Sequence, residues 1–417
     1  MKAFNLVNQA TSLRGSGSVA KVLFAIALVA SFAQFGAVSS LNDVAKHFGH
    51  VAASGSLQSK VGLSGSVLGV GLAVLRLASL MALPMASLAD RFGRKKILQR
   101  TLVVGLLATA TAALSPAYWF FVACFALARP LLSASSTLVQ VVTVELSSTH
   151  ERIHRLAVIS AGAGIGAGLS AVLHGIIRGP NSFRWLFAVA IIPVFLLSPL
   201  LERIEEPTRR VDDATLARLG AVPGELRERL VIICAVAFAV GMVTGPANGF
   251  AFVYGEGVLK ISPQFVAGVV ASSALTGLGG LVFGRYLAKR HGRRWTVGVG
   301  VLATALTSTF AYSGGKVNFT CGYLVGVGAA GVLAPAASAL STEVFSHRFR
   351  ATAAAWVVVA GVLGATSGLF LFGFVGDALH TSGISALRIP AIVTFLPLLP
   401  VVFLLSRLPE SAHMELS

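Results

Sequence analysis

Between two long apolar runs, the chain carries the short polar stretch LADRFGRK at residues 88–95. A related stretch, LAKRHGRR, stands at residues 287–294, again directly after a long apolar run. A second pair of matches lies further along each half, where Glu145 precedes Arg152 and Glu343 precedes Arg350 at the same spacing. Self-similarity of this kind predicts a chain that is built from two related structural units.

The composition excludes a soluble surface for most of the chain. Of the 417 residues, 55% are hydrophobic and only 12% are charged, whereas soluble domains carry about 25% charged residues. Too few polar side chains remain to cover a water-soluble protein of this length. The surface therefore has to face lipid, where only helices and closed barrels pair all of their backbone groups.

Apolar runs of about 20 residues, the length that crosses a bilayer core, recur along both halves. They predict an all-α integral membrane protein with twelve transmembrane helices in two pseudo-symmetric six-helix bundles. The expected helices of the first half are 21–42, 62–88, 97–114, 117–144, 153–177 and 183–201. Those of the second half are 230–255, 263–287, 295–313, 319–342, 351–375 and 387–407.

The expected domains follow from these helices. The N-terminal bundle covers 21–201 and the C-terminal bundle covers 230–407, and the charged segment 202–229 links them. Residues 1–20 and 408–417 are short tails. Most of the 33 Lys and Arg residues fall on one side if both termini are cytoplasmic, which is the orientation that the positive-inside rule favours. We therefore expect a multi-pass protein of the cytoplasmic (inner) membrane.

The net charge of +17 does not indicate a nucleic-acid partner, because the basic residues form short clusters between apolar runs. No cofactor or metal is expected, since the three cysteines lie apart in or beside apolar stretches and have no metal-ligand spacing. No nucleophile-base set or phosphate loop is recognisable, so the sequence predicts that the protein is not an enzyme.

The stretch at 86–95, ASLADRFGRK, resembles the signature loop of the major facilitator superfamily, G-x-L-A-D-R-x-G-R-R, between helices two and three. Ala86 replaces the leading glycine, and Lys289 replaces the acidic residue in the second copy. The resemblance extends to the twelve helices and the central charged loop. It implies two bundles around a central cavity, alternating access of that cavity to the two sides, and a chain that acts as a monomer.

The resemblance also implies a cytoplasmic latch between the bundles. In the first half it would use Asp90, Arg94, Glu145 and Arg152. In the second half Glu343 with Arg293 or Arg350 could replace the charge pairing that Lys289 removes. The alternative interpretation of this loop is a topology signal with a stable turn, because its basic cluster also faces anionic headgroups.

Two arginines lie inside expected membrane helices, where an ionisable side chain costs about 2.5–3.5 kcal/mol on insertion scales. They are Arg76 and Arg129. Polar residues follow Arg129 at helical spacing and predict a polar stripe, namely Ser133, Ser136 and Gln140. The family resemblance implies that this helix lines the cavity. The alternative is that Arg129 binds backbone carbonyls that Pro130 frees.

Acidic residues are absent from the interiors of the expected helices, so the two arginines lack an obvious carboxylate partner. We interpret this as a site for an anionic substrate, most simply an organic carboxylate, which can bind Arg in a bidentate manner. Three further positions on the first and seventh helices suit the wall of such a cavity: Gln34, Asn248 and Tyr254.

Proton coupling would need a titratable group, and the sequence offers three candidates. Asp43 and Glu256 lie at the outer ends of the first and seventh helices, and His174 lies toward the outer end of the fifth. The leading functional hypothesis is secondary transport of a small organic anion. The alternatives are efflux of amphipathic drugs and, from a different class, a transporter-like sensor or assembly partner.

Overall fold

The computed structural model describes residues 2–49, 57–147, 151–177, 179, 181–201, 224–345, 347–378 and 386–408. Most of the expected linker, 202–223, and the expected tail from residue 409 onward lie outside these residues. Every regular element within them is helical, as the sequence predicts. The chain forms two compact units, one of residues 1–39 and 81–212 and one of residues 40–80 and 213–417.

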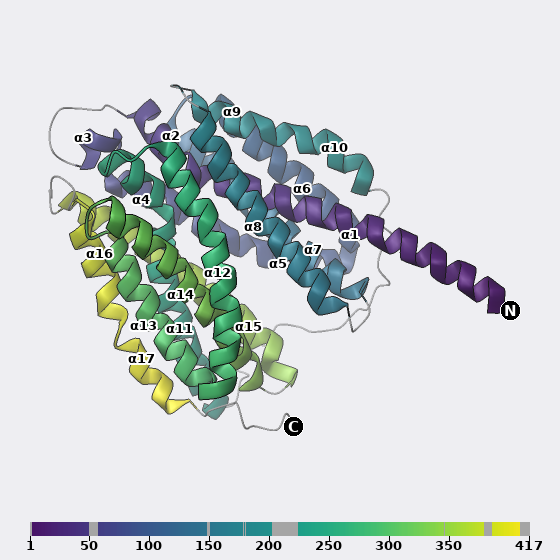
Figure 1. Cartoon of the computed structure of the whole chain (residues 1–417). Coiled ribbons are helices and arrows are strands. Elements are labelled where there is room, and N and C mark those ends of the chain that lie inside the picture. Colours follow the sequence, from purple (N-terminus) through teal and green to yellow (C-terminus); the bar gives the residue numbers. More distant parts are fainter. Residues whose placement is uncertain are drawn as a thin grey trace. The chain divides into compact units, whose positions relative to one another are not determined.

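Among its described residues, the first unit contains seven α-helices, which are coloured from purple to teal in Figure 1. They are α1 (Lys2–Ser39), α5 (Ala82–Phe92), α6 (Arg94–Thr111), α7 (Tyr118–Glu145), α8 (Arg152–Ile176), α9 (Ser182–Ala188) and α10 (Ile192–Leu201). Helix α1 packs against α8 and α7, and α6 packs against α7. Their shared core is aliphatic, with Ile26, Ala30, Leu106 and Leu132 fully buried.

The second unit begins with three helices from the N-terminal half, α2 (Leu41–Phe48), α3 (Leu57–Val61) and α4 (Gly65–Ala78). Its larger elements are α11 (Gly224–Gly249), a π-helical turn (Val253–Val258), α12 (Pro263–His291), α13 (Arg293–Ala311), α14 (Lys316–Glu343), α15 (His347–Ala378), α16 (Arg388–Phe395) and α17 (Val401–Leu404). Helix α14 lies against both α12 and α13, and α15 lies against both α11 and α4 (Figure 1).

The membrane helices agree with the sequence prediction. Among the described residues, ten helices are long and apolar enough to cross a membrane. They coincide with ten of the twelve expected ranges. The other two ranges, 183–201 and 295–313, coincide with the apolar helices α9 to α10 and with α13. The described residues therefore account for each of the twelve expected helices.

The two related polar stretches fold in the same way. Gly93 separates α5 from α6 with φ of 99°, and Gly292 separates α12 from α13 with φ of 91°. Both glycines have ψ above 130°, and this combination is essentially restricted to glycine. The glycine that the two stretches share therefore makes the sharp turn between two membrane helices in each half.

Segment 40–80 was expected to belong to the N-terminal bundle, and in this structure it packs with the C-terminal half. Helix α4 runs antiparallel to α15, since Gly65 approaches Gly373 and Gly69 approaches Leu369. Small residues on both helices let the two backbones come close. The predicted division into two bundles at the linker stays a prediction, and the compact units differ from it by this segment.

We expect a methyl group at Gly364 to separate α11 from α15. The added carbon would clash with the backbone carbonyl oxygen of Phe238, which has no rotamer to relieve the overlap. Overpacking of this kind costs about 1–3 kcal/mol, so Gly364→Ala should lower the free energy of unfolding measured in mixed detergent micelles. Gly279→Ala on α12 is the matched control, because nothing lies within 4 Å of its added carbon. Equal stability of the two variants would contradict this packing.

Candidate functional site

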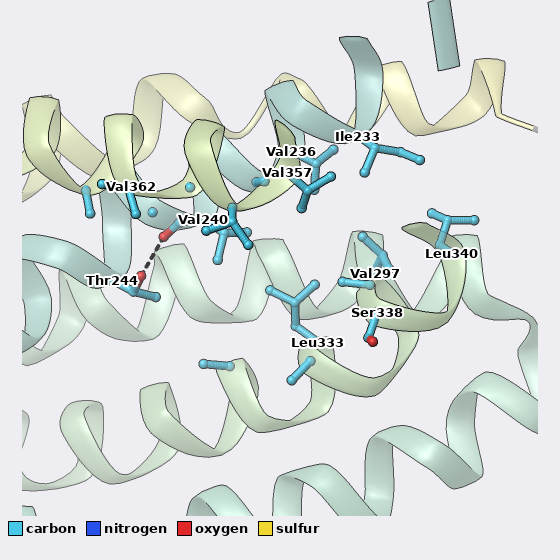
Figure 2. A pocket seen from close by; sticks show the side chains of 18 of the residues that line it. Ile233, Val236, Val240, Thr244, Val297, Leu333, Ser338, Leu340, Val357 and Val362 are labelled. Atoms are coloured by element: carbon cyan, nitrogen blue, oxygen red, sulfur yellow. Dashed lines mark hydrogen bonds between the residues drawn. The ribbon is translucent and has the colours of Figure 1, made fainter. Parts of the chain in front are cut away.

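A cavity of the second unit has a volume of about 610 Å³ and lies between α11, α14 and α15. Figure 2 shows its side chains converging from these helices, with Thr244 and Val362 toward one end and Ile233 and Leu340 toward the other. The wall is almost entirely aliphatic, so the cavity can accept a ligand only where apolar surface is part of that ligand.

Among the described residues of the cavity wall, Arg76 supplies the only formal charge. It lies in the last turn of α4, and its side chain is partly buried. Within the described part of the chain, no hydrogen bond or ion pair engages its guanidinium. The sequence predicted Arg76 as a substrate-binding residue, and the structure places it in a cavity wall without a protein counter-ion.

The other polar side chains of the described wall are the hydroxyl groups of Thr244 and Ser338. The Thr244 hydroxyl donates to the carbonyl oxygen of Val240 at 2.8 Å, so its proton is already used within α11. The cavity therefore combines one fixed positive charge with little neutral hydrogen-bonding capacity.

Arg129 lies in the first unit, on α7, where the predicted polar stripe is present. Gln34 of α1 joins this stripe, because its Oε1 accepts from Ser133 at 3.1 Å and its Nε2 donates to Ser136 at 3.4 Å. The structure thus brings together three of the predicted residues beside Arg129. Gln140 is exposed at the far end of the stripe.

Asn248 lines a second, smaller cavity of about 120 Å³ in the second unit. Its Oδ1 accepts a hydrogen bond of 3.1 Å from the hydroxyl of Tyr323, a residue that the sequence analysis did not single out. Tyr254, the other wall residue predicted on the expected seventh helix, lies in the π-helical turn and lines neither cavity. It is fully buried in an aromatic cluster, with its ring 4.8 Å from that of Tyr312.

Glu256 is a buried carboxylate in the π-helical turn, with only 4% of its surface exposed. The Nδ2 group of Asn42, also buried, donates to its Oε2 at 3.0 Å. Asp43, the other acidic candidate for proton coupling, lies next to Asn42 on α2 and is partly buried. His174 is buried near the end of α8 in the first unit, so the three candidates do not form one cluster within either unit.

A group of three lysines lies near the π-helical turn, on the predicted outer side. Burial lowers the pKa of Lys260 below its ordinary value, and the positive charges of Lys46 and Lys60 lower it further. A cluster of charges of one sign raises the local concentration of oppositely charged solutes. This arrangement favours the approach of anions, and the sequence analysis missed it because the three residues come from separate segments.

Asp377 is a second feature that the sequence analysis did not single out. Its two carboxylate oxygens accept hydrogen bonds of 2.7 Å from the backbone N–H groups of Gly65 and Ser66. These donors begin α4, where helical N–H groups have no partner within the helix and carry a partial positive charge. Asp377 at the end of α15 therefore clamps the start of α4.

The predicted cytoplasmic latch is described only in part. Arg94 forms an ion pair with Glu145 in the first unit. Arg293 begins α13, and its neighbour Arg294 donates to the carbonyl of Leu408 at 2.9 Å. The side chains of four predicted members lie outside what the structure describes: Asp90, Arg152, Glu343 and Arg350. The latch stays a prediction.

The sequence profile of the Major Facilitator Superfamily matches residues 23–289 and 259–416. The chain belongs to this family, which confirms the resemblance that the signature loop indicated. It is therefore a multi-pass membrane protein with the fold of a secondary transporter and not an enzyme. No curated protein matches the sequence.

Solved transporter structures share the fold over nearly the whole chain. A bacterial homolog of the human lysosomal transporter Spinster superposes with a TM-score of 0.78 at 16% identity, over 96% of this chain and 98% of that one. The nucleoside transporter NupG gives 0.77 at 11% identity, over 93% and 99%. The xylose transporter XylE from E. coli gives 0.74 at 16% identity, over 96% and 98%. At these identities the likeness concerns the fold alone.

We expect Asp377→Asn to loosen the first turn of α4. An amide has one acceptor oxygen and no charge, so one of the two hydrogen bonds and the charge–dipole attraction are lost. Loss of a helix cap costs about 1 kcal/mol, so amide hydrogen exchange at Gly65 and Ser66 should accelerate about fivefold.

Ser64→Ala is the matched control for this clamp. The Ser64 hydroxyl accepts from the N–H of Val67 at 3.3 Å and lies 3.1 Å from the Ser66 hydroxyl. Its removal should affect Val67, while the backbone N–H groups of Gly65 and Ser66 keep Asp377 as their acceptor. Unchanged exchange at Gly65 and Ser66 in Asp377→Asn would show that the carboxylate does not hold this helix end.

Proposed function

We propose that the protein is a secondary transporter for organic anions in the cytoplasmic membrane, working by alternating access as a monomer with both termini in the cytoplasm. The observation that carries the proposal is the position of Arg76. Its guanidinium lies in the wall of a 610 Å³ apolar cavity, and no described residue pairs with it. A positively charged group in such a wall favours a ligand that carries a negative charge.

Arg76 loses hydration where its guanidinium meets the apolar wall. The Arg guanidinium is a cation in proteins, and an isolated cation surrounded by apolar groups loses hydration without compensation. A bound carboxylate restores two parallel hydrogen bonds and neutralises the charge. Ligand binding therefore compensates the charge of Arg76. The protein with a bound anion avoids the desolvation cost that the protein with an empty cavity carries.

Arg129 is our proposed second cationic site on the transport pathway. Its surroundings differ from those of Arg76, because the linked amide and hydroxyl groups of Gln34, Ser133 and Ser136 can supply neutral hydrogen bonds to a bound solute. The cytoplasmic latch remains part of this proposal, and the ion pair between Arg94 and Glu145 supports it.

A second candidate function is efflux of amphipathic compounds, and the aliphatic wall of the cavity favours it. Neutral or cationic drugs would bind there through apolar surface, and Arg76 would then have no role in their recognition. A sensor or assembly partner is the alternative from another class. Saturable uptake by the purified protein in liposomes would exclude it.

We propose Glu256 as the site of proton coupling. It is buried and hydrogen-bonded to Asn42, and protonation would turn this acceptor into a neutral group that can also donate. The elements packed against its turn, α2, α3 and α12, place further charged groups nearby. On α2 and α3 these are Asp43, Lys46, His47 and Lys60.

Arg76→Gln should strongly reduce the stabilisation of the purified protein by carboxylates. At a concentration of 100 Kd, a ligand that binds only the folded state stabilises it by about 2.7 kcal/mol. A hydrogen bond to a charged group contributes about 1.5–3 kcal/mol, so affinity for a panel of aliphatic and aromatic carboxylates should fall about tenfold to a hundredfold. Thermal unfolding of the detergent-solubilised protein measures this.

Arg407→Gln provides the control for loss of a positive charge, because Arg407 is exposed at the end of the last helix and lines no described cavity. Arg129→Ala is measured in parallel. Stabilisation by lipophilic cations that is equal in the native protein and in Arg76→Gln would refute anion transport and favour drug efflux.

Glu256→Gln should separate proton coupling from solute binding. The Gln oxygen can still accept from Asn42, so the fold is kept, but the side chain no longer titrates. We expect uptake driven by a pH gradient in liposomes to be lost while exchange of internal and external substrate continues. Gradient-driven uptake at the native rate would remove Glu256 from the coupling mechanism.

A further inference from the structure

The lining of the main cavity follows three helices without interruption. On α11 the lining residues recur at the spacing of one helical face from Ile233 to Gly245, and on α15 they do so from Ala354 to Ala365. Helix α14 contributes a parallel run from Ala330 to Leu340. At 1.5 Å per residue, these runs are each about 15–18 Å long. The cavity is therefore an elongated slot along the helix axes.

Arg76 lies at one end of this slot. Helices α4 and α15 are antiparallel, with Gly65 opposite Gly373 and Gly69 opposite Leu369. Continuing this register along both helices brings Arg76 opposite Val362. Val362 and Thr244 mark one end of the slot in Figure 2, whereas Ile233 and Leu340 mark the other. The charge is thus terminal, and the opposite end is aliphatic except for the hydroxyl of Ser338.

The wall beyond Arg76 excludes solutes that carry polar groups along their length. A buried hydroxyl or amide without a hydrogen-bond partner costs about 1–3 kcal/mol in proteins, and the Thr244 hydroxyl proton is already engaged. A sugar or nucleoside in this slot would leave several such groups unpaired. An alkyl chain, in contrast, gains about 0.8 kcal/mol for each methylene that it buries.

We propose that the slot binds amphipathic anions, with one anionic head group at Arg76 and an unbranched alkyl tail that extends between α11, α14 and α15 toward Ile233 and Leu340. This proposal rests on the proposed function and narrows its substrate class. From Val362 to Ala354 and from Thr244 to Ile233 the slot measures about 12–16 Å along the helix axes. An extended chain advances about 1.2 Å per bond, so the tail that fills it has roughly ten to thirteen carbons.

The test is a homologous series of straight-chain carboxylates, from two to sixteen carbons, binding to the full chain in phosphatidylcholine nanodiscs. Partition into empty nanodiscs is subtracted. We expect affinity to rise about fourfold per added methylene, to level off at roughly ten to thirteen carbons, and to depend on Arg76 throughout. Primary alcohols and alkyltrimethylammonium ions of equal length should bind at least tenfold more weakly.

Two tryptophan variants on α14 test the path of the tail. Ala334 lines the slot, so Ala334→Trp should block it and remove the dependence on chain length while the four-carbon acid still binds. Val325 is on the same helix with 56% of its surface exposed and lines no described cavity. Val325→Trp should bind the series as the native protein does, which controls for the added ring.

The possible failures are distinguishable. Arg76-dependent binding of carboxylates that is independent of chain length would overturn the tail slot and leave organic-anion transport intact. Binding of alcohols as tightly as carboxylates would overturn the head-group assignment. If no carboxylate of any length binds, or if Arg76→Gln changes nothing, the proposed function fails and this inference fails with it.

Discussion

The absence of water in the bilayer core is the constraint on which the rest of this structure depends. Each backbone N–H and C=O group there must be paired within the chain, which leaves helices as the economical solution. Helices without a hydrophobic drive between them associate through close packing of small residues, and α11 meets α15 at Gly364 in this way. Helix ends need partners from elsewhere, and the carboxylate of Asp377 fills that need at the start of α4.

The same absence of water makes an unpaired charge such as that of Arg76 costly. A guanidinium in the membrane costs several kcal/mol on most estimates, and the described surroundings of Arg76 offer aliphatic side chains instead of a counter-ion. Glu256, by contrast, is buried with an amide donor from Asn42. The carboxyl group of Glu256 has a partner within the protein, and we propose that a solute supplies the partner of Arg76. This difference separates a candidate structural or coupling site from a candidate substrate site.

Much of this architecture could be predicted from the sequence, because the length of an apolar run is a direct consequence of bilayer thickness. The stripe of Ser133 and Ser136 was also predictable, since it follows from helical periodicity alone.

Asp377 was not recognised because its partners are backbone groups, which look the same at every position of a sequence. The surroundings of Tyr254 were equally unreadable: its hydroxyl suggested a cavity wall, and the sequence does not show that rings from distant segments, Tyr312 and Phe319, pack against it. The slot itself could not be predicted from the sequence, because a stripe of valine and alanine can equally face lipid, a neighbouring helix or a ligand.

Helix α4 connects two of these features mechanically. Its first residues are held by Asp377, and its last turn carries Arg76, eleven residues later and about 16 Å away. A helix of this length moves as one rigid element, so a force on one end is felt at the other. A ligand that pairs with Arg76 therefore acts on the same body that the carboxylate of Asp377 anchors to α15. The proposed anion site and the Asp377 clamp thus lie at the two ends of one rigid helix, which is the kind of element whose equilibrium two sites can bias together.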